Sequence, residues 1–280
     1  MSYNPSDEKV FTKSNLDEYL KELSVEFRKE YGRKAEAEII LIGGAAVLAN
    51  YDFRANTTDV DAVVRANSSL KSMVNRVGDK HGLPNNWLNS DFLRTDSYSL
   101  KLAQYSQHYR RYGGLEVRTV SGEYLIAMKL CSGRKYKKDM SDIVGVLQEH
   151  KLAGKPIMME DIDKAVVNLY GSWDRISEFS ISFIKDVLQN ENYENVYLAI
   201  KDREEEIKEM SLDIQEKQKT GETNLDLKDI LEEISFEQFL EPTKVPTLDE
   251  ILESINQELE QDNNSVSAKN EINIDDDIGY

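Results

Sequence analysis

Apolar residues recur every three or four positions between residues 15 and 31, which predicts a first helix. Ser14 or Asn15 can cap its start, and Gly32 can end it. Shorter apolar or alternating runs then predict strands, and the stretches between them have the composition of helices. The predicted strands are 38–42, 58–64 and 115–120, and the predicted helices between them are 45–50 and 68–80. Residues 87–112 carry Trp87 and several tyrosines and are predicted to be strand or loop.

After residue 120 the spacing of apolar residues becomes helical and remains so. Helices are predicted at 121–134, 139–150, 160–170, near 177–189, at 225–240 and at 248–260. Ser121 should cap the helix at 121–134. Cys131 falls on the apolar side of this helix, which predicts that it is a core residue. Pro242 and Pro246 separate the last two. Residues 201–222 are weakly amphipathic, which fits either an exposed helix or a linker.

This order of elements predicts an α+β fold in which a small mixed sheet flanked by helices precedes a mostly helical, acidic C-terminal region. We expect a sheet domain at 1–150 and a helical domain at 151–200. An acidic helical extension at 201–261 and a polar, disordered tail at 262–280 would follow.

Charge divides the chain in the same way. The 280 residues carry a formal net charge of −17, of which residues 1–150 contribute +2 and residues 151–280 contribute −19. An acidic half can repel polyanions, contact a basic partner or only keep a protein in solution, whereas the first half is compatible with nucleic acid. One cysteine and three scattered histidines exclude an internal disulfide and a zinc pattern. Because the N-terminus is polar and no apolar run reaches the ~18 residues of a membrane helix, we expect a cytoplasmic protein without a membrane partner.

The candidate chemistry lies in two neighbouring motifs. Gly43 and Gly44 separate a predicted strand from a predicted helix, where free N–H groups can bind phosphate. Asp59 and Asp61 follow on the next strand, and residues two apart on a strand point to the same side. Two carboxylates on one side repel each other unless a cation lies between them, and Mg²⁺ favours oxygen ligands.

These residues resemble a known pattern. A Gly-Gly pair, a short helix and then Arg-x-x-[ST]-x-Asp-x-Asp is similar to the nucleotidyltransferase superfamily of polymerase-β type. More narrowly, it resembles the AbiEii-like toxins of abortive-infection and type IV toxin–antitoxin systems. The residues that carry this first block are Gly43, Gly44, Arg54, Thr57, Thr58, Asp59 and Asp61. A second block resembles a later segment of the same group and consists of Leu125, Lys129, Leu130, Arg134, Lys138, Asp139 and Asp142.

The resemblance covers roughly residues 36–150 and implies metal-dependent transfer of a nucleotide from an NTP. It implies catalytic roles for Asp59, Asp61 and Lys129, and NTP binding by Gly43, Gly44, Arg54, Thr58 and Lys129. It also implies Mg²⁺ or Mn²⁺ bound by Asp59 and Asp61 together with a third carboxylate. Glu116 is the best candidate by position, although Arg118 shares its face of the strand and can pair with it instead. Arg134, Asp139 and Asp142 would surround these residues; Arg54 would orient Asp59 or touch phosphate.

The sequence defines the acceptor of the nucleotide less well than the NTP site. Basic residues with interleaved tyrosines suit a phosphate backbone with stacked bases, hence RNA such as a tRNA acceptor end. This set is Arg110, Arg111, Arg118, Arg134, Lys135, Lys137 and Lys138 with Tyr109, Tyr112 and Tyr136. The leading hypothesis is a toxin that modifies RNA and is neutralised by an antitoxin protein. Two alternatives remain: an enzyme that modifies a protein or a small molecule such as an aminoglycoside, and a catalytically degenerate module that binds a partner.

Overall fold

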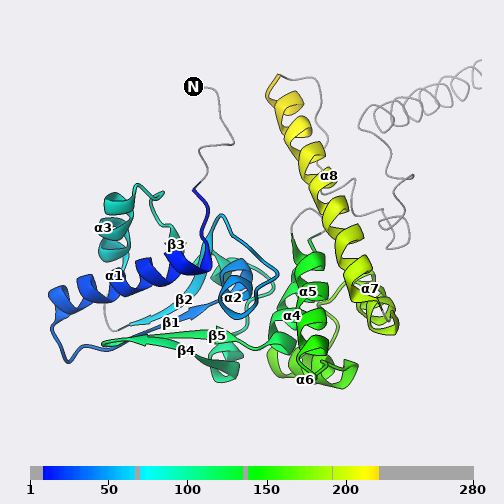
Figure 1. The fold of residues 1–280 in the computed structure, drawn as a ribbon, viewed down its shortest axis with the longest axis horizontal. Coiled ribbons are helices and arrows are strands. Elements are labelled where there is room, and N and C mark those ends of the chain that lie inside the picture. Colours follow the sequence, from blue (N-terminus) through cyan, green and yellow to red (C-terminus); the bar gives the residue numbers. More distant parts are fainter. Residues whose placement is uncertain (1–8, 67–69, 135–137, 191, 221–280) are drawn as a thin grey trace, which may run out of the picture. The chain divides into compact units, whose positions relative to one another are not determined.

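The structure is a computed structural model, and it describes residues 9–66, 70–134, 138–190 and 192–220 (Figure 1). Clustering of contacts divides the chain into two compact units, residues 1–204 and 205–280. The strands are β1 (Ala37–Leu41), β2 (Val60–Ala66), β3 (Leu88–Asn89), β4 (Ser106–Tyr112) and β5 (Leu115–Val120). The helices are α1 (Lys13–Tyr31), α2 (Gly43–Asn50), α3 (Lys71–His81), α4 (Gly122–Ser132), α5 (Asp139–Leu152), α6 (Met159–Tyr170), α7 (Glu178–Gln189) and α8 (Tyr193–Thr220). Two 3₁₀ helices, η2 (Asp91–Arg94) and η3 (Leu100–Tyr105), lie between β3 and β4.

The strands form one mixed sheet in the order β3-β2-β1-β5-β4. The central strand β1 runs antiparallel to β2 and parallel to β5. β4 and β5 form an antiparallel hairpin, and its turn uses Gly113 at φ 58°. The predicted α+β class with a small mixed sheet is thereby confirmed, and the 87–112 stretch supplies two strands and two 3₁₀ helices.

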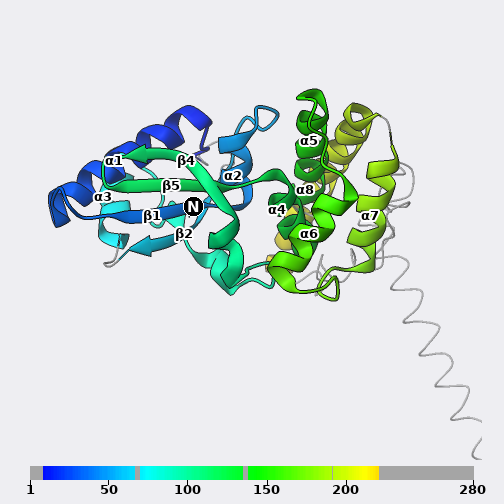
Figure 2. The same cartoon turned by 90° about the horizontal axis from the view of Figure 1, so that it is seen from below.

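Helices α1 and α3 cover one face of the sheet, and Figure 2 looks onto the other face with these helices behind the strands. The buried side of α1 is apolar, as its spacing predicts, with Leu16, Leu20, Leu23 and Phe27 in the core. Its N-cap is Thr12, not Ser14 or Asn15. Thr12 and Asn15 bond reciprocally in a capping box, which leaves Asn15 as the third helical residue.

Helices α5, α6 and α7 pack against α4, which also contacts α2. Nearly every residue of α4 from Gly122 to Leu130 is buried for this reason. Cys131, expected in the core, lies half-buried at its end, and burial raises the pKa of its thiol. No described helix is both long and apolar enough to cross a membrane.

The predicted domain boundaries fall within helices. The position after residue 150 lies inside α5, and the position after residue 200 lies inside α8. Residues 201–220 are helical, as part of α8. The helices expected at 225–240 and 248–260 and the tail expected at 262–280 lie outside the described residues.

Candidate functional site

The glycine pair forms the first turn of α2. β1 ends at Leu41, and α2 begins directly at Gly43, so a single residue connects strand and helix. Gly43 has φ +54°, which disfavours a side chain, and a Cβ there would lie 3.4 Å from Oδ2 of Asp61. A Cβ on Gly44 would lie only 2.6 Å from Oγ1 of Thr57. The two glycines therefore let the Asp61 carboxylate and the Thr57 hydroxyl approach the N-terminus of α2.

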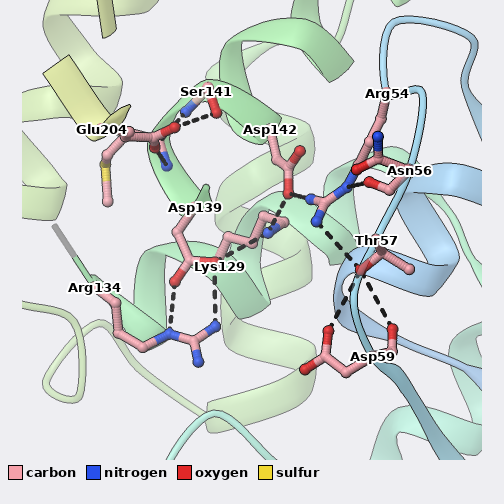
Figure 3. Close-up of polar contacts among 11 residues, drawn as sticks. Arg54, Asn56, Thr57, Asp59, Lys129, Arg134, Asp139, Ser141, Asp142 and Glu204 are labelled. Carbon is pink, nitrogen blue, oxygen red and sulfur yellow. Dashed lines mark hydrogen bonds and ion pairs between the residues drawn. The ribbon is translucent and has the colours of Figure 1, made fainter. Parts of the chain in front are cut away.

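Asp59 and Asp61 flank the first residue of β2. Asp59 precedes the strand and is exposed, whereas Asp61 is half-buried and its carbonyl accepts a hydrogen bond from the N–H of Ile42, 3.1 Å away. The Thr57 hydroxyl lies 3.3 Å from Oδ1 and 3.2 Å from the carbonyl oxygen of Asp59, and can donate to either (Figure 3). Thr58, predicted to bind nucleotide, is exposed beside them.

Arg54 connects this loop to α5. Its Nη1 forms an ion pair with Oδ2 of Asp142, its Nε donates to the carbonyl of Asn56 at 3.1 Å, and its Nη2 donates to Oγ1 of Thr57 at 3.4 Å. The Arg54 side chain is only 13% exposed, and the Asp142 side chain only 3%. Arg54 thus orients the loop that carries Asp59, and its guanidinium lies within 2.8 Å of where a Gly44 Cβ would be.

Lys129 of α4 is enclosed by carboxylates. Its Nζ lies 2.7 Å from Asp142 and 3.0 Å from Asp139, and Nε of Arg134 lies 3.0 Å from Asp139 (Figure 3). We call these five residues, Arg54 included, the buried ion-pair network. The Lys129 side chain is 8% exposed and has two carboxylate partners on α5, so it connects α4 to α5. Its role in NTP binding stays a prediction. The structure thus joins Arg134, Asp139 and Asp142 to Lys129.

Charge compensation sets the protonation of this network. Burial alone would lower the pKa of Lys129, but the carboxylates of Asp142 and Asp139 raise it above its usual range. Burial alone would raise the pKa of Asp139, but Lys129 and Arg134 hold it below its usual range. Both groups are therefore charged at neutral pH.

Glu116, predicted as a third metal ligand, is not brought to this site. It pairs with Glu38 across β1 and β5, while Asp61 adjoins Ile42 at the other end of β1. Four residues along a strand separate these ends by about 13 Å. The Glu116 carboxylate instead accepts from Nδ1 of His108 at 2.6 Å and lies 3.8 Å from Arg111. β5 carries no other acidic residue, so this strand supplies no third carboxylate.

The described members of the basic set expected to bind RNA lie in several places. Arg110 bonds to Asp17 of α1 at 3.1 Å, together with the hydroxyls of Tyr109 and Tyr112. Arg134 belongs to the buried ion-pair network. Arg111 and Arg118 instead line a groove of about 790 Å³, which we call the sheet groove, together with Arg65, Glu36, Glu38 and Glu116. Lys135, Tyr136 and Lys137 lie outside the described residues.

The donor set fits a cation that arrives with phosphate. Within the described ranges no three His, Cys, Asp or Glu side chains cluster as a metal site. Mg²⁺, however, is often bound by one or two carboxylates together with substrate phosphates. Asp61 beside the N-terminus of α2 provides an oxygen donor of this kind next to N–H groups suited to phosphate. Asp59 provides a second one just before β2, and not on the strand as the sequence predicted.

Sequence reasoning gave no role to three residues that shape this site. Thr57 stands inside the quoted motif, so its spacing before Asp59 was the available signal. Glu149 accepts from the N–H groups of Asp52 and Phe53 at 2.8 and 2.9 Å. Glu204 accepts from the N–H groups at the start of α5. The last two have no local signal, because their partners are 96 and 63 or more residues away in the chain.

Comparison with known proteins agrees with this geometry at the level of the family. The family described as "Nucleotidyltransferase of unknown function (DUF6036)" matches residues 18–208, which is more than half of the chain. No curated protein and no solved structure matches this chain. The match spans the sheet, the glycine pair, both aspartates and the buried ion-pair network.

Proposed function

Because the chain belongs to this family of nucleotidyltransferases of unknown function, we propose that it transfers a nucleoside monophosphate from an NTP to an acceptor hydroxyl. The observation that carries the proposal is the approach of Asp61 to the first turn of α2, where Gly43 leaves 3.4 Å between a would-be Cβ and the carboxylate. The N-terminus of a helix attracts anions, and the Asp61 carboxylate beside it, with Asp59 two residues earlier, favours a cation. A metal-bound triphosphate satisfies both requirements.

In this proposal each group of the chain has a defined task. The N–H groups of Gly43 and Gly44 bind the terminal phosphates, and Asp59 and Asp61 hold Mg²⁺ or Mn²⁺. A bound metal of this kind lowers the pKa of an acceptor hydroxyl and offsets charge on the departing group. The acceptor oxygen bonds to the α-phosphorus, the bond from that phosphorus to the bridging oxygen breaks, pyrophosphate leaves and the hydroxyl proton passes to water. Lys129 acts from within the buried ion-pair network and supports the loop through Asp142.

The acceptor is proposed to lie along the sheet groove. Arg65 pairs with Glu38 across the strands, and Arg65 and Asp61 are four residues apart on β2, so the groove and Asp61 share a face of the sheet. The Arg65 and Arg111 side chains are 60% and 54% exposed, which leaves them able to exchange a carboxylate for a phosphate. We therefore retain RNA as the proposed acceptor, and a protein or small molecule as the alternative. The toxin role and an antitoxin partner remain predictions that rest on the resemblance alone.

The test is incubation of the full chain with each α-³²P-labelled NTP, Mg²⁺ and a cell lysate, followed by separation of RNA, protein and small molecules. We expect label in RNA with one NTP, no label with EDTA, and loss of at least ~10³-fold for Asp59→Ala, because a metal-bound group supplies several kcal/mol. Circular dichroism must show that the variant is folded. Label in protein or small molecules would move the acceptor to the alternative class. Transfer that persists in folded Asp59→Ala would refute the catalytic role, and no transfer at all would favour the binding module.

A further inference from the structure

One face of α5 holds the segment between α2 and β2 at three points. Glu149 accepts from the N–H groups of Asp52 and Phe53. The Phe53 ring packs so closely on Gly145 that a Cβ there would lie 2.5 Å from it. Asp142 forms the ion pair with Arg54. Positions 142, 145 and 149 share one face of a helix, so a single surface of α5 determines where this segment lies.

The contacts continue from Asp142 to Asp59 in one direction. Each guanidinium nitrogen of Arg54 has its own partner: Nη1 contacts Asp142, Nε contacts the carbonyl of Asn56, and Nη2 contacts Oγ1 of Thr57. Thr57 is 2% exposed, and its backbone pairs with Phe11 through two hydrogen bonds of 2.7 and 2.9 Å. A threonine hydroxyl has one hydrogen, and because it accepts from Arg54 it directs that hydrogen at Asp59, where the carbonyl oxygen at 3.2 Å and Oδ1 at 3.3 Å are both in reach. Donation to Oδ1 would hold the carboxylate in one orientation.

From this chain of contacts we infer that Asp142 is a positioning residue, which orients the carboxylate of Asp59 for metal binding through Arg54 and Thr57. The inference rests on the proposed function, since it assigns Asp59 to a metal. Groups that orient a metal ligand without touching the metal typically contribute 10–100-fold to affinity or activity. In this way the helical part of the fold sets the geometry of an aspartate that lies just before β2.

A purely structural role for Asp142 makes a different prediction. Asp142 also neutralises Lys129, and removal of one partner of a buried ion pair strongly destabilises a protein. A structural role therefore lowers stability without changing the affinity of the folded protein for a metal. Metal affinity measured on folded protein separates the two roles.

The experiment titrates the full chain with Mn²⁺ in the presence of one equivalent of a non-hydrolysable NTP, because the proposed site binds its cation together with phosphate. The salt is about 150 mM, where exposed charges are screened, and free Mn²⁺ is read by electron paramagnetic resonance. The Asp59→Ala/Asp61→Ala variant with the same NTP gives the background from the nucleotide and from other acidic residues. Thr57→Val removes only the hydroxyl, and Thr57→Ser restores it. Thr119→Val is the matched control, because Thr119 is 1% exposed and also donates one side-chain hydrogen bond, to Asn50 at 2.9 Å, away from Asp59. Asp142→Asn and the double variant with Thr57→Val complete the set.

We expect Thr57→Val and Asp142→Asn each to weaken Mn²⁺ binding about 10–100-fold, with Thr57→Ser and Thr119→Val close to wild type. The double variant should bind Mn²⁺ no more weakly than whichever single variant binds it less well, because Thr57 and Asp142 act in one series of contacts. Wild-type affinity in folded Thr57→Val, or additive losses in the double variant, would overturn the inference while leaving the metal site intact. If wild type and Asp59→Ala/Asp61→Ala bind Mn²⁺ equally, the proposed metal site itself is wrong and the inference is wrong with it.

Discussion

At Gly44 the space that a side chain would occupy is already filled. A Cβ there would lie 2.6 Å from Oγ1 of Thr57 and 2.8 Å from Nη2 of Arg54. Both side chains are fixed by other partners, so neither can move aside freely. Gly43 differs, because its constraint is a positive φ together with one contact at 3.4 Å. The two adjacent glycines are thus required for different physical reasons.

Gly44→Ala is expected to displace Thr57 and Arg54 and to lower nucleotide transfer at least ~10-fold, because small shifts of positioned groups are costly in catalysis. Its unfolding free energy should fall by about 1–3 kcal/mol through overpacking. Gly154→Ala is the control: Gly154 has φ +71° and no neighbour within 4 Å, so only backbone strain changes. Transfer assays and urea unfolding measure both effects. Unchanged transfer in Gly44→Ala would show that the loop tolerates displacement.

At the scale of elements, α5 acts as a template for the segment that follows α2. The Phe53 ring packs on Gly145 and also contacts Tyr51 and Tyr197, each with ring centroids 5.8 Å away. A larger residue at 145 would push the ring and the attached backbone outwards. The position of this segment depends on the helix as well as on its own sequence.

Gly145→Ala is therefore expected to lower the unfolding free energy by about 1–3 kcal/mol, because an added methyl group overpacks this contact. The variant Phe53→Leu makes room for the methyl group, so the double variant should lose less stability than the two single variants together. Urea unfolding of the four proteins measures this coupling. Strict additivity would mean that the ring does not press on α5.

The strands and helices of the first half show how much of the fold the sequence could predict. Strands β1 and β5 and the helices of the first half follow from apolar spacing, and the side of β5 on which Glu116 lies follows from alternation. The sequence does not show where Glu116 lies along the sheet, because that depends on the register of β5 against β1. Only the pairing of Glu116 with Glu38 shows that Glu116 lies beside the start of β1, away from Asp61. Parallel register is set by packing of the intervening elements, which local spacing does not encode. The contacts of Glu149 and Glu204 were unpredictable for the same reason.

At the scale of the whole molecule, buried carboxyl groups connect stability to pH. Glu204 accepts from the N–H groups of Met140 and Ser141 at 3.1 and 3.0 Å, yet burial raises its pKa to about 8. The folded state therefore binds a proton at Glu204 that the unfolded state releases near its usual pKa of about 4.3. Asp139 has the opposite sign, since its pKa is lowered in the folded state. Its contribution is present above the ordinary carboxyl range and is lost as pH falls below it.

Stability is thus expected to be greatest near pH 5 and to fall between about pH 5 and 8 as the proton of Glu204 is released. Glu204→Gln keeps the oxygen acceptor and removes the titration, so its unfolding free energy should change little over this range. At pH 8 the unfolding free energy of Glu204→Gln should exceed that of wild type by several kcal/mol, on the order of 4–5 kcal/mol for this shift. The matched control is Glu205→Gln, which removes the same charge from the next, exposed residue of α8 and should keep the wild-type slope. Urea unfolding at a series of pH values measures all three proteins. Parallel curves for wild type and Glu204→Gln would mean that Glu204 is ionised in the folded state, its charge stabilised by the N-terminus of α5.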